Sequence, residues 1–386
     1  MNIGVFFRQS NQPAVTTILY PIFQGSAEVI KGGVDEFQFP RPREFKIQDN
    51  GINFHFSTEI EDLMYCDIRL LCDSTRNFQE STFERYQGII DYYLLSVMEG
   101  ESLTGQEQRD CPKWLNERDD VVIFCGHRWT VIEDHPRAIT DRAINIFYFY
   151  NAHGYYYLNF YPMQDKRHLI GVYNKYDNYK TFRKKLLDLF SDYADQEIHK
   201  FNIEHTFYTD VGGKILDPWA WQSQHITSYL DFNTAVANIV FETQVGDHPE
   251  DMLTEKTMKS IIFQRADIFI IYCGTARGLD WLHSKGFWFL NSEFYEPDNF
   301  ENVPDFPGNL RNNQEIAIPV YRSVYKAVDY LKKLKDEYGS NNEVYKVLID
   351  KYRLKLDQNV TALENLMTNC EYKQKLFDII TRKPAK

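Results

Sequence analysis

Strand-like and helix-like segments alternate between residues 237 and 290, and this alternation restricts the possible fold more than any other feature of the chain. Short apolar runs that suit buried strands occupy residues 237–243, 267–274 and 287–290. Between them, residues 254–263 and 276–286 place apolar side chains at helical spacing. Strands that alternate with helices in this way predict a parallel sheet with helices packed on its faces. The second half of the chain is therefore expected to contain an α/β unit.

The first half of the chain has a related pattern. Residues 2–7, 67–74 and 119–128 have the composition of buried strands that end in polar loops. Residues 83–100 have apolar side chains near helical spacing, and the aromatic runs on either side of the turn-like sequence NAHG predict an antiparallel hairpin formed by residues 143–161. A second α/β unit is therefore expected here.

The chain has 386 residues, which is more than one hydrophobic core usually accommodates. We expect Rossmann-like domains at residues 1–165 and 166–330, joined near the polar stretch 162–168. From Val320 onward the spacing is helical and glycine interrupts it only at Gly339. Residues 331–386 are therefore expected to form C-terminal helices that pack back on the domains.

Composition excludes several classes of protein. The net charge of −12 argues against general binding of nucleic acid, although the basic stretches Arg41–Arg43 and Lys180–Lys185 could form one local positive face. No apolar run reaches the roughly 18–20 residues that span a bilayer, and no signal peptide is recognisable, so a cytoplasmic protein without a membrane partner is expected. The six cysteines lack CxxC spacing, and no metal-binding, P-loop, GxSxG or HExxH motif occurs.

The helix expected at residues 254–263 begins with an unusual charge. Thr254 suits the N-cap, and Glu255 suits the positive end of the helix dipole. Lys256 in the same turn is opposed by that dipole, at a cost on the order of 0.3–1 kcal/mol. A phosphate bound at the helix start would offset this cost. The alternative is a lysine that extends into water or pairs with Glu250 or Asp251.

This segment resembles the donor-binding motif of the α1,3-fucosyltransferases, which are nucleotide-sugar glycosyltransferases of the GT-B fold. It is also similar to a segment of phage glycosyltransferase-like proteins. The resemblance covers roughly 50 residues. The residues that carry it are Phe241-Glu242 at a strand end, Thr254-Glu255-Lys256-Thr257 at a helix start, Lys259, Gly274 after the next strand, and Gly286-Phe287.

The resemblance implies two Rossmann-like domains that face a central cleft, with the donor site in the second domain. It assigns Glu255 to the ribose diol and Lys256 to the diphosphate of the donor. Two departures, Phe-Glu-Thr in place of the family's Phe-Glu-Asn and Ile268–Ile271 in place of its Val-Pro-Val strand, bear on the identity of the sugar and nucleotide. A UDP-sugar is favoured, a GDP-sugar is the alternative, and no tightly bound cofactor or metal is expected. The expected donor-binding residues are Glu242, Thr254, Glu255, Lys256, Lys259 and Gly274.

Catalytic groups are expected at strand ends of the first domain. Asp73 could deprotonate an acceptor hydroxyl, and His127 is a second candidate base. Arg8 and Arg128 are candidates for contacts with the acceptor or with phosphate. Each has a structural alternative, because Asp73 could cap the next segment, His127 could be a satisfied loop histidine, and Arg8 could pair with an acidic residue.

The chain also resembles glycosyltransferases of T-even-like phages. Those enzymes attach glucose or arabinose to 5-hydroxymethylcytosine in DNA. Hydroxymethylated double-stranded DNA is therefore the expected acceptor, and the host cytoplasm the expected location. Aromatic side chains around His153 could stack on an extruded base. Two alternatives remain. One is a fucosyltransferase-like enzyme that acts on a glycan or lipid-linked sugar, and the other is a non-enzymatic protein that binds nucleotide sugars.

Overall fold

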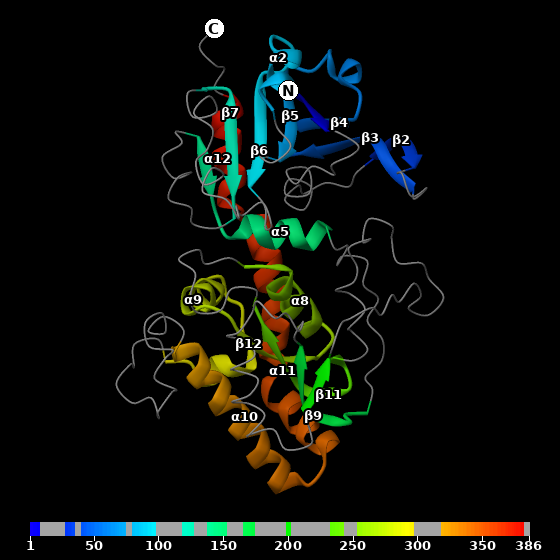
Figure 1. Cartoon of the computed structure of the whole chain (residues 1–386). Coiled ribbons are helices and arrows are strands. Elements are labelled where there is room, and N and C mark those ends of the chain that lie inside the picture. The colour runs from blue at the N-terminus through cyan, green and yellow to red at the C-terminus, as the bar shows by residue number, and fades with distance from the viewer. Residues whose placement is uncertain are drawn as a thin grey trace. The chain divides into compact units, whose positions relative to one another are not determined.

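The chain has an α/β fold that separates into two compact units (Figure 1). Unit 1 comprises Met1–Gly154, Asp217–Ala220 and Met367–Lys386, and unit 2 comprises Tyr155–Leu216 and Trp221–Leu366. The computed structural model describes residues 1–7, 28–34, 40–74, 79–97, 118–126, 137–152, 165–173, 198–201, 232–242, 253–296 and 318–381.

The centre of unit 1 is an eight-stranded sheet with the order β2-β3-β4-β1-β5-β6-β7-β8. The strands from β4 to β8 in this order run parallel to one another, whereas β2-β3 and β3-β4 are antiparallel pairs. Strands β2 to β4 lie on one side of β1, and β5 to β8 lie on the other. The order in which successive strands are added to the sheet therefore reverses at β1. The strands are β1 (Asn2–Phe7), β2 (Glu28–Val34), β3 (Pro40–Asp49), β4 (Ile52–Ser57), β5 (Ile68–Ser74), β6 (Tyr92–Val97), β7 (Val121–Cys125) and β8 (Ala138–Thr140).

A two-residue turn joins β3 to β4. Asn50 and Gly51 occupy it with φ values of 49° and 76°. Asn-Gly is the residue pair that tolerates two successive positive φ angles, and such a turn matches the right-handed twist of a hairpin. This local sequence therefore fixes the register of the antiparallel part of the sheet.

The helices described in unit 1 are η2 (Ile60–Leu63), α2 (Glu80–Tyr86), α5 (Ala143–Ala152) and α12 (Glu371–Thr381). Helix α12 packs against β7 and α5, since the ring of Tyr372 contacts those of Phe124 and Phe147. A buried ion pair between Lys373 and Asp49 also joins α12 to the end of β3. The last helix of the chain is thus part of the core of unit 1.

Unit 2 contains a four-stranded parallel sheet with the order β10-β9-β11-β12. The chain crosses from β10 past β9 to β11, so the direction of strand addition reverses between β9 and β11. The strands are β9 (His168–Tyr173), β10 (Ile198–Phe201), β11 (Ala235–Phe241) and β12 (Phe269–Cys273). The helices described in unit 2 are α8 (Glu255–Gln264), α9 (Ala276–Ser284), η7 (Leu290–Phe294), α10 (Ile318–Tyr338) and α11 (Asn341–Thr368). The last two residues of α11 belong to unit 1.

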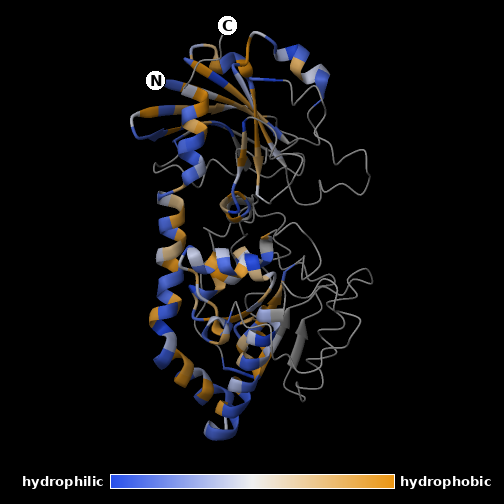
Figure 2. Ribbon diagram, turned by 90° about the vertical axis from the view of Figure 1, so that its left-hand side faces the viewer, coloured by the Kyte–Doolittle hydropathy of each residue, from blue (hydrophilic) through white to orange (hydrophobic). Residues whose placement is uncertain are grey.

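The two long C-terminal helices agree with the helical pattern expected from Val320 onward. Gly339, at φ 75°, ends α10, and the hydroxyl of Ser340 accepts a hydrogen bond from the N–H of Glu343 at the start of α11. Figure 2 shows polar and apolar residues mixed along these helices, in contrast to the mainly hydrophobic strands of the unit 1 sheet. Within the described residues, no helix combines the length and the apolar content needed to cross a bilayer.

The strands expected at residues 2–7, 67–74, 119–125, 237–242 and 267–274 and the helices expected at residues 254–263 and 276–286 are confirmed, but three other expectations are wrong. In the first, the helix expected over residues 83–100 ends at Tyr86. Gly88 follows with φ 79°, and Tyr92–Val97 form β6. Strand β6 lies between β5 and β7 and is buried on both faces, so it lacks the polar alternation that marks a half-buried strand.

The expectation of a first hairpin strand at residues 143–150 is also wrong, because Ala143–Ala152 form helix α5. Asp141 caps this helix, since its side chain accepts a hydrogen bond of 2.9 Å from the N–H of Ala143. All five residues from Ala143 to Phe147 are buried, so no periodic exposure marks this segment as a helix. Residues 155–161 and His153 lie outside the described residues.

The third wrong expectation is the strand at residues 287–290. Asn359 of α11 donates to the carbonyl oxygen of Trp288 at 2.8 Å and accepts from its N–H at 2.6 Å. A side-chain amide therefore takes the place of a neighbouring strand. A side-chain amide also pairs with the backbone of β12. Asn291 accepts a hydrogen bond from the N–H of Tyr272 at 2.8 Å and donates one to its carbonyl oxygen at 3.0 Å.

Candidate functional site

Glu242 organises the carboxyl edge of the unit 2 sheet. It follows β11 directly, is buried, and accepts hydrogen bonds from the N–H groups of Thr254 and Thr257 at 3.2 and 2.9 Å. The hydroxyl groups of the same two threonines also donate to its carboxylate. Four donors from the start of α8 thus converge on one carboxylate. Such an arrangement satisfies N–H groups that a helix cannot pair itself and places a negative charge at the positive end of its dipole.

This geometry bears on the unusual charge of Lys256. The sequence left open whether a phosphate faces the helix start or the lysine extends into water or pairs with Glu250 or Asp251. The structure places the carboxylate of Glu242 at the helix start, on the N–H groups of Thr254 and Thr257. Thr254 is the N-cap as expected, and its hydroxyl accepts from the N–H of Lys256 at 3.3 Å. The cation in the first turn therefore lies on a helix whose dipole already faces an internal carboxylate.

The two lysines of α8 are both sequestered. Lys256 is 9% exposed, and Lys259, one turn further along, is fully buried. Glu255 is the first residue of α8, and its side chain lies outside the described part of the structure. Burial of an ammonium group is costly unless it has a negative or polar partner, so the positions of both lysines are set by their surroundings and not by free movement in water.

Gly274 follows β12 and is required there for space. A Cβ atom at this position would lie 2.5 Å from the phenol oxygen of Tyr272, whose ring lies against the glycine. The same phenol oxygen is 3.3 Å from the hydroxyl of Thr257. Gly274 therefore acts through Tyr272, which supports the start of α8 from the neighbouring strand.

A second helix start lies beside the first. Strands β11 and β12 are paired in parallel up to Phe241 and Cys273, and Glu242 donates its N–H to the carbonyl oxygen of Cys273. Helix α9 begins three residues later, and the hydroxyl of its N-cap Thr275 accepts from the N–H of Gly278 at 3.0 Å. Both helices thus begin at the carboxyl edge of adjacent strands, and β11, the strand before α8, borders the point where the strand order reverses. Open α/β sheets bind ligands at this place.

In unit 1, Asp73 occupies the equivalent position. It lies near the carboxyl end of β5, adjacent to β1, at the reversal of strand order, and its side chain is 0% exposed. Beyond β7, a Cβ atom on Gly126 would overlap the amide of the buried Asn145 in α5, so this position requires glycine. The other candidates of this unit, Arg8, His127 and Arg128, lie outside the described residues.

Sequence reasoning missed Thr257 and Tyr272, although the first is visible in the motif as the threonine that follows Lys256. Among the residues that the structure describes, no three histidine, cysteine or acidic side chains are grouped so that they could hold a metal ion. Comparison of the chain with models of known protein families and with curated proteins gives no match.

Proposed function

We propose that the protein is a glycosyltransferase that binds a nucleoside-diphosphate sugar at the carboxyl edge of the unit 2 sheet and transfers the sugar to a hydroxyl group. The observation that supports this most directly is the position of Lys256. It lies in the first turn of a helix that starts beside the reversal of strand order, within a Thr-Glu-Lys sequence that resembles the donor motif of the α1,3-fucosyltransferases.

The internal cap determines how such a donor would be held. Because Glu242 engages the N–H groups of Thr254 and Thr257, the diphosphate would depend on the ammonium group of Lys256 and not on those two N–H groups. Glu255 would accept hydrogen bonds from the ribose diol. Glu242, Thr254 and Gly274 would then position the site without contact with the donor, and the buried Lys259 would contribute positive charge to it.

For the acceptor, we propose 5-hydroxymethylcytosine in phage DNA, on the strength of the resemblance to phage glycosyltransferases. Deprotonation of its hydroxyl group would fall to Asp73 or His127 at strand ends of unit 1. Of the basic stretches considered for DNA contact, Arg41–Arg43 lie in β3, whereas Lys180–Lys185 lie outside the described residues.

A panel of UDP- and GDP-sugars, with the parent nucleosides as controls, tests the proposal by thermal denaturation. A ligand present at 100 times its dissociation constant adds about 2.7 kcal/mol to the free energy of unfolding. We expect stabilisation by one class of diphosphate and none by its nucleoside at equal concentration. If no nucleotide sugar raises the melting temperature, the proposed donor site is wrong.

The acceptor is tested separately with the donor that binds. Hydroxymethylated DNA, unmodified DNA of the same sequence and a set of glycan acceptors are incubated with radiolabelled donor, and transfer to each is measured. Transfer only to hydroxymethylated DNA is expected. Transfer only to glycans would favour the glycan-directed enzyme, and binding without any transfer would favour the non-enzymatic protein.

A further inference from the structure

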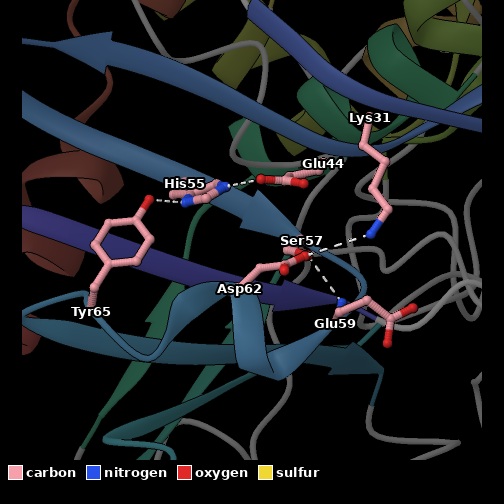
Figure 3. Close-up of polar contacts among 7 residues, drawn as sticks. All are labelled: Lys31, Glu44, His55, Ser57, Glu59, Asp62 and Tyr65. Atoms are coloured by element: carbon pink, nitrogen blue, oxygen red, sulfur yellow. Dashed lines mark hydrogen bonds and ion pairs between the residues drawn. The ribbon is translucent and has the colours of Figure 1, made fainter.

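A chain of three side chains crosses one face of the unit 1 sheet (Figure 3). Glu44 is on β3, His55 is on the neighbouring β4, and Tyr65 lies between η2 and β5. The Nε2 atom of His55 is 2.8 Å from Oε1 of Glu44, and its Nδ1 atom is hydrogen-bonded to the phenol of Tyr65. The imidazole is thus held between a carboxylate and a phenol.

The surrounding segment is built so that Tyr65 reaches His55. Gly4 of β1 is the ladder partner of His55, and a Cβ atom on Gly4 would come within 3.0 Å of Leu63 and 3.1 Å of Cys66. The absence of a side chain at this position therefore lets the segment that carries Tyr65 cross the sheet closely. The hydroxyl of Ser57 fixes the start of the same segment, because it donates to Asp62 at 2.8 Å and accepts from the N–H of Glu59 at 3.0 Å.

The direction of the hydrogen bonds follows from the acceptor character of a carboxylate. Glu44 can only accept, so neutral His55 carries its hydrogen on Nε2 and leaves the lone pair of Nδ1 for the O–H of Tyr65. The phenol proton is therefore directed at a base that a carboxylate orients. This is the relation between nucleophile, base and orienting acid that activates hydroxyl nucleophiles in enzymes.

The three side chains differ in solvent exposure, and the nucleophile of such a group must be exposed to reach a substrate. His55 is 5% exposed, whereas Tyr65 is 58% exposed. Partial burial raises the pKa of Tyr65, and the charges of Cys66, Glu44 and Asp62 raise it further. Free phenolate is consequently scarce at neutral pH, and reaction at the phenol oxygen depends on removal of the proton by His55.

Charged groups of both signs lie near this tyrosine. Glu44 and Asp62 add negative charge beside the phenol, and the ammonium group of Lys31 lies 4.0 Å from Asp62. Glycosyl transfer develops positive charge at the anomeric carbon and ring oxygen of a sugar, and tyrosine is a known type of nucleophile in such reactions.

We propose that Tyr65 is a glycosyl acceptor, and that the protein attaches to it one sugar from the nucleoside-diphosphate sugar on which the proposed function rests. The phenol oxygen bonds to the anomeric carbon, and the bond from that carbon to the nucleoside diphosphate breaks, with its electron pair leaving on the diphosphate. The phenol proton passes to Nδ1 of His55, and the resulting imidazolium is stabilised by Glu44 and later releases the proton to water. The products are a tyrosyl glycoside and the free nucleoside diphosphate.

Intact-protein mass spectrometry tests this after incubation of the full chain with each nucleotide sugar that raises its melting temperature. We expect a mass increase of one sugar residue, located by peptide mapping on Tyr65. The Tyr65→Phe variant should lose the increase, whereas Tyr338→Phe, a control at another exposed tyrosine, should keep it.

The role of His55 is tested by rate. Loss of a general base should slow attachment at least about tenfold in His55→Gln, with the donor-induced rise in melting temperature unchanged. If that variant does not fold, Glu44→Gln serves the same purpose. A rise in melting temperature without any mass increase, or an increase that persists in Tyr65→Phe, would overturn the assignment of Tyr65 and leave the donor site intact. If no nucleotide sugar binds at all, both proposals fail.

Discussion

The carboxylate of Glu242, the residue that follows β11, accepts hydrogen bonds from both the backbone N–H and the hydroxyl of Thr257 in the first turn of α8. One strand end thereby anchors the start of the next helix across a gap of 15 residues in sequence. The relationship also supplies the negative charge that a lysine-bearing helix start needs, without any ligand. A role for Lys256 in binding must therefore be tested on the lysine itself.

Replacement of Glu242 by glutamine should destabilise the protein. Glutamine has one acceptor oxygen in place of two and turns an NH₂ group toward donors that it cannot satisfy, so a buried hydrogen-bond donor is left unpaired at a cost of about 1–3 kcal/mol. The free energy of unfolding is measured by urea denaturation. Glu343→Gln, at an exposed acidic residue in α11, is the matched control and should change it little. Equal stability of Glu242→Gln and the wild type would show that the cap contributes nothing.

For Lys256→Ala, we expect binding of a nucleoside diphosphate to weaken at least about tenfold while binding of the nucleoside is unchanged, because in the proposed complex the lost charge would face phosphate. Isothermal titration with UDP, GDP and their nucleosides measures both affinities. The exposed Lys346 provides the control substitution Lys346→Ala in the same unit. A parallel loss of affinity for diphosphate and nucleoside would argue that Lys256 supports the fold of the site and does not contact phosphate.

Asp73→Asn should retain the donor-induced rise in melting temperature and lower the single-turnover rate by about 10²–10⁴, the usual contribution of a positioned base. Asparagine matches the shape of the buried carboxyl group, so packing is preserved. Asp119→Asn, at an exposed aspartate before β7, is the control. If His127 is the base instead, Asp73→Asn will react at the wild-type rate, and the rate will fall as the pH decreases through about 6.5.

Lys166 should make the stability of unit 2 depend on pH. Its ammonium group is buried, donates to the backbone oxygen of Asn233 at 2.6 Å, and lies 4.3 Å from the ring centre of Tyr345. Burial lowers the pKa of Lys166 from 10.5 to about 8, although Asp267 opposes this shift. Between these two values the unfolded chain binds a proton that the folded chain has released, so the free energy of unfolding should rise with pH.

The variant Lys166→Met removes this titration and keeps the length of the side chain. Urea denaturation from pH 7 to 10.5 should show the wild type gaining stability relative to the variant above about pH 8, with a constant difference below it. Lys346→Met controls for the general loss of a charge. A difference that stays constant over the whole range would mean that the lysine is charged in the folded protein throughout.

The sequence predicts those elements whose signals are local. Buried strands such as β5 and β12 are short apolar runs bounded by polar residues, and Thr254 marks the start of α8 by its capping preference. The hairpin of β3 and β4 was not predicted, although Asn50-Gly51 is a strong local signal for it.

Other features depend on partners distant in sequence. The backbone of Trp288 pairs with Asn359, which is 71 residues away, and no pattern near residue 288 reveals this. The acidic residue that caps the start of α8 could not be identified from local spacing either, because Glu242 precedes Thr254 by 12 residues and follows a different element. The hydrogen-bonded side chains of Glu44, His55 and Tyr65 lie on two strands and on the segment between η2 and β5, and they likewise form no compact motif in the sequence.

Asn291 has a consequence for how copies of this protein behave toward one another. Strand β12 is at the edge of its sheet, where unpaired N–H and carbonyl groups would offer a template for a strand from a second molecule. At Tyr272 both of these groups are taken by one side-chain amide, which also bonds the hydroxyl of Ser323 in α10 and so cannot turn away easily. The amide closes the edge at this residue and cannot itself continue a ladder of hydrogen bonds, so a strand from a second molecule cannot pair with β12 at Tyr272.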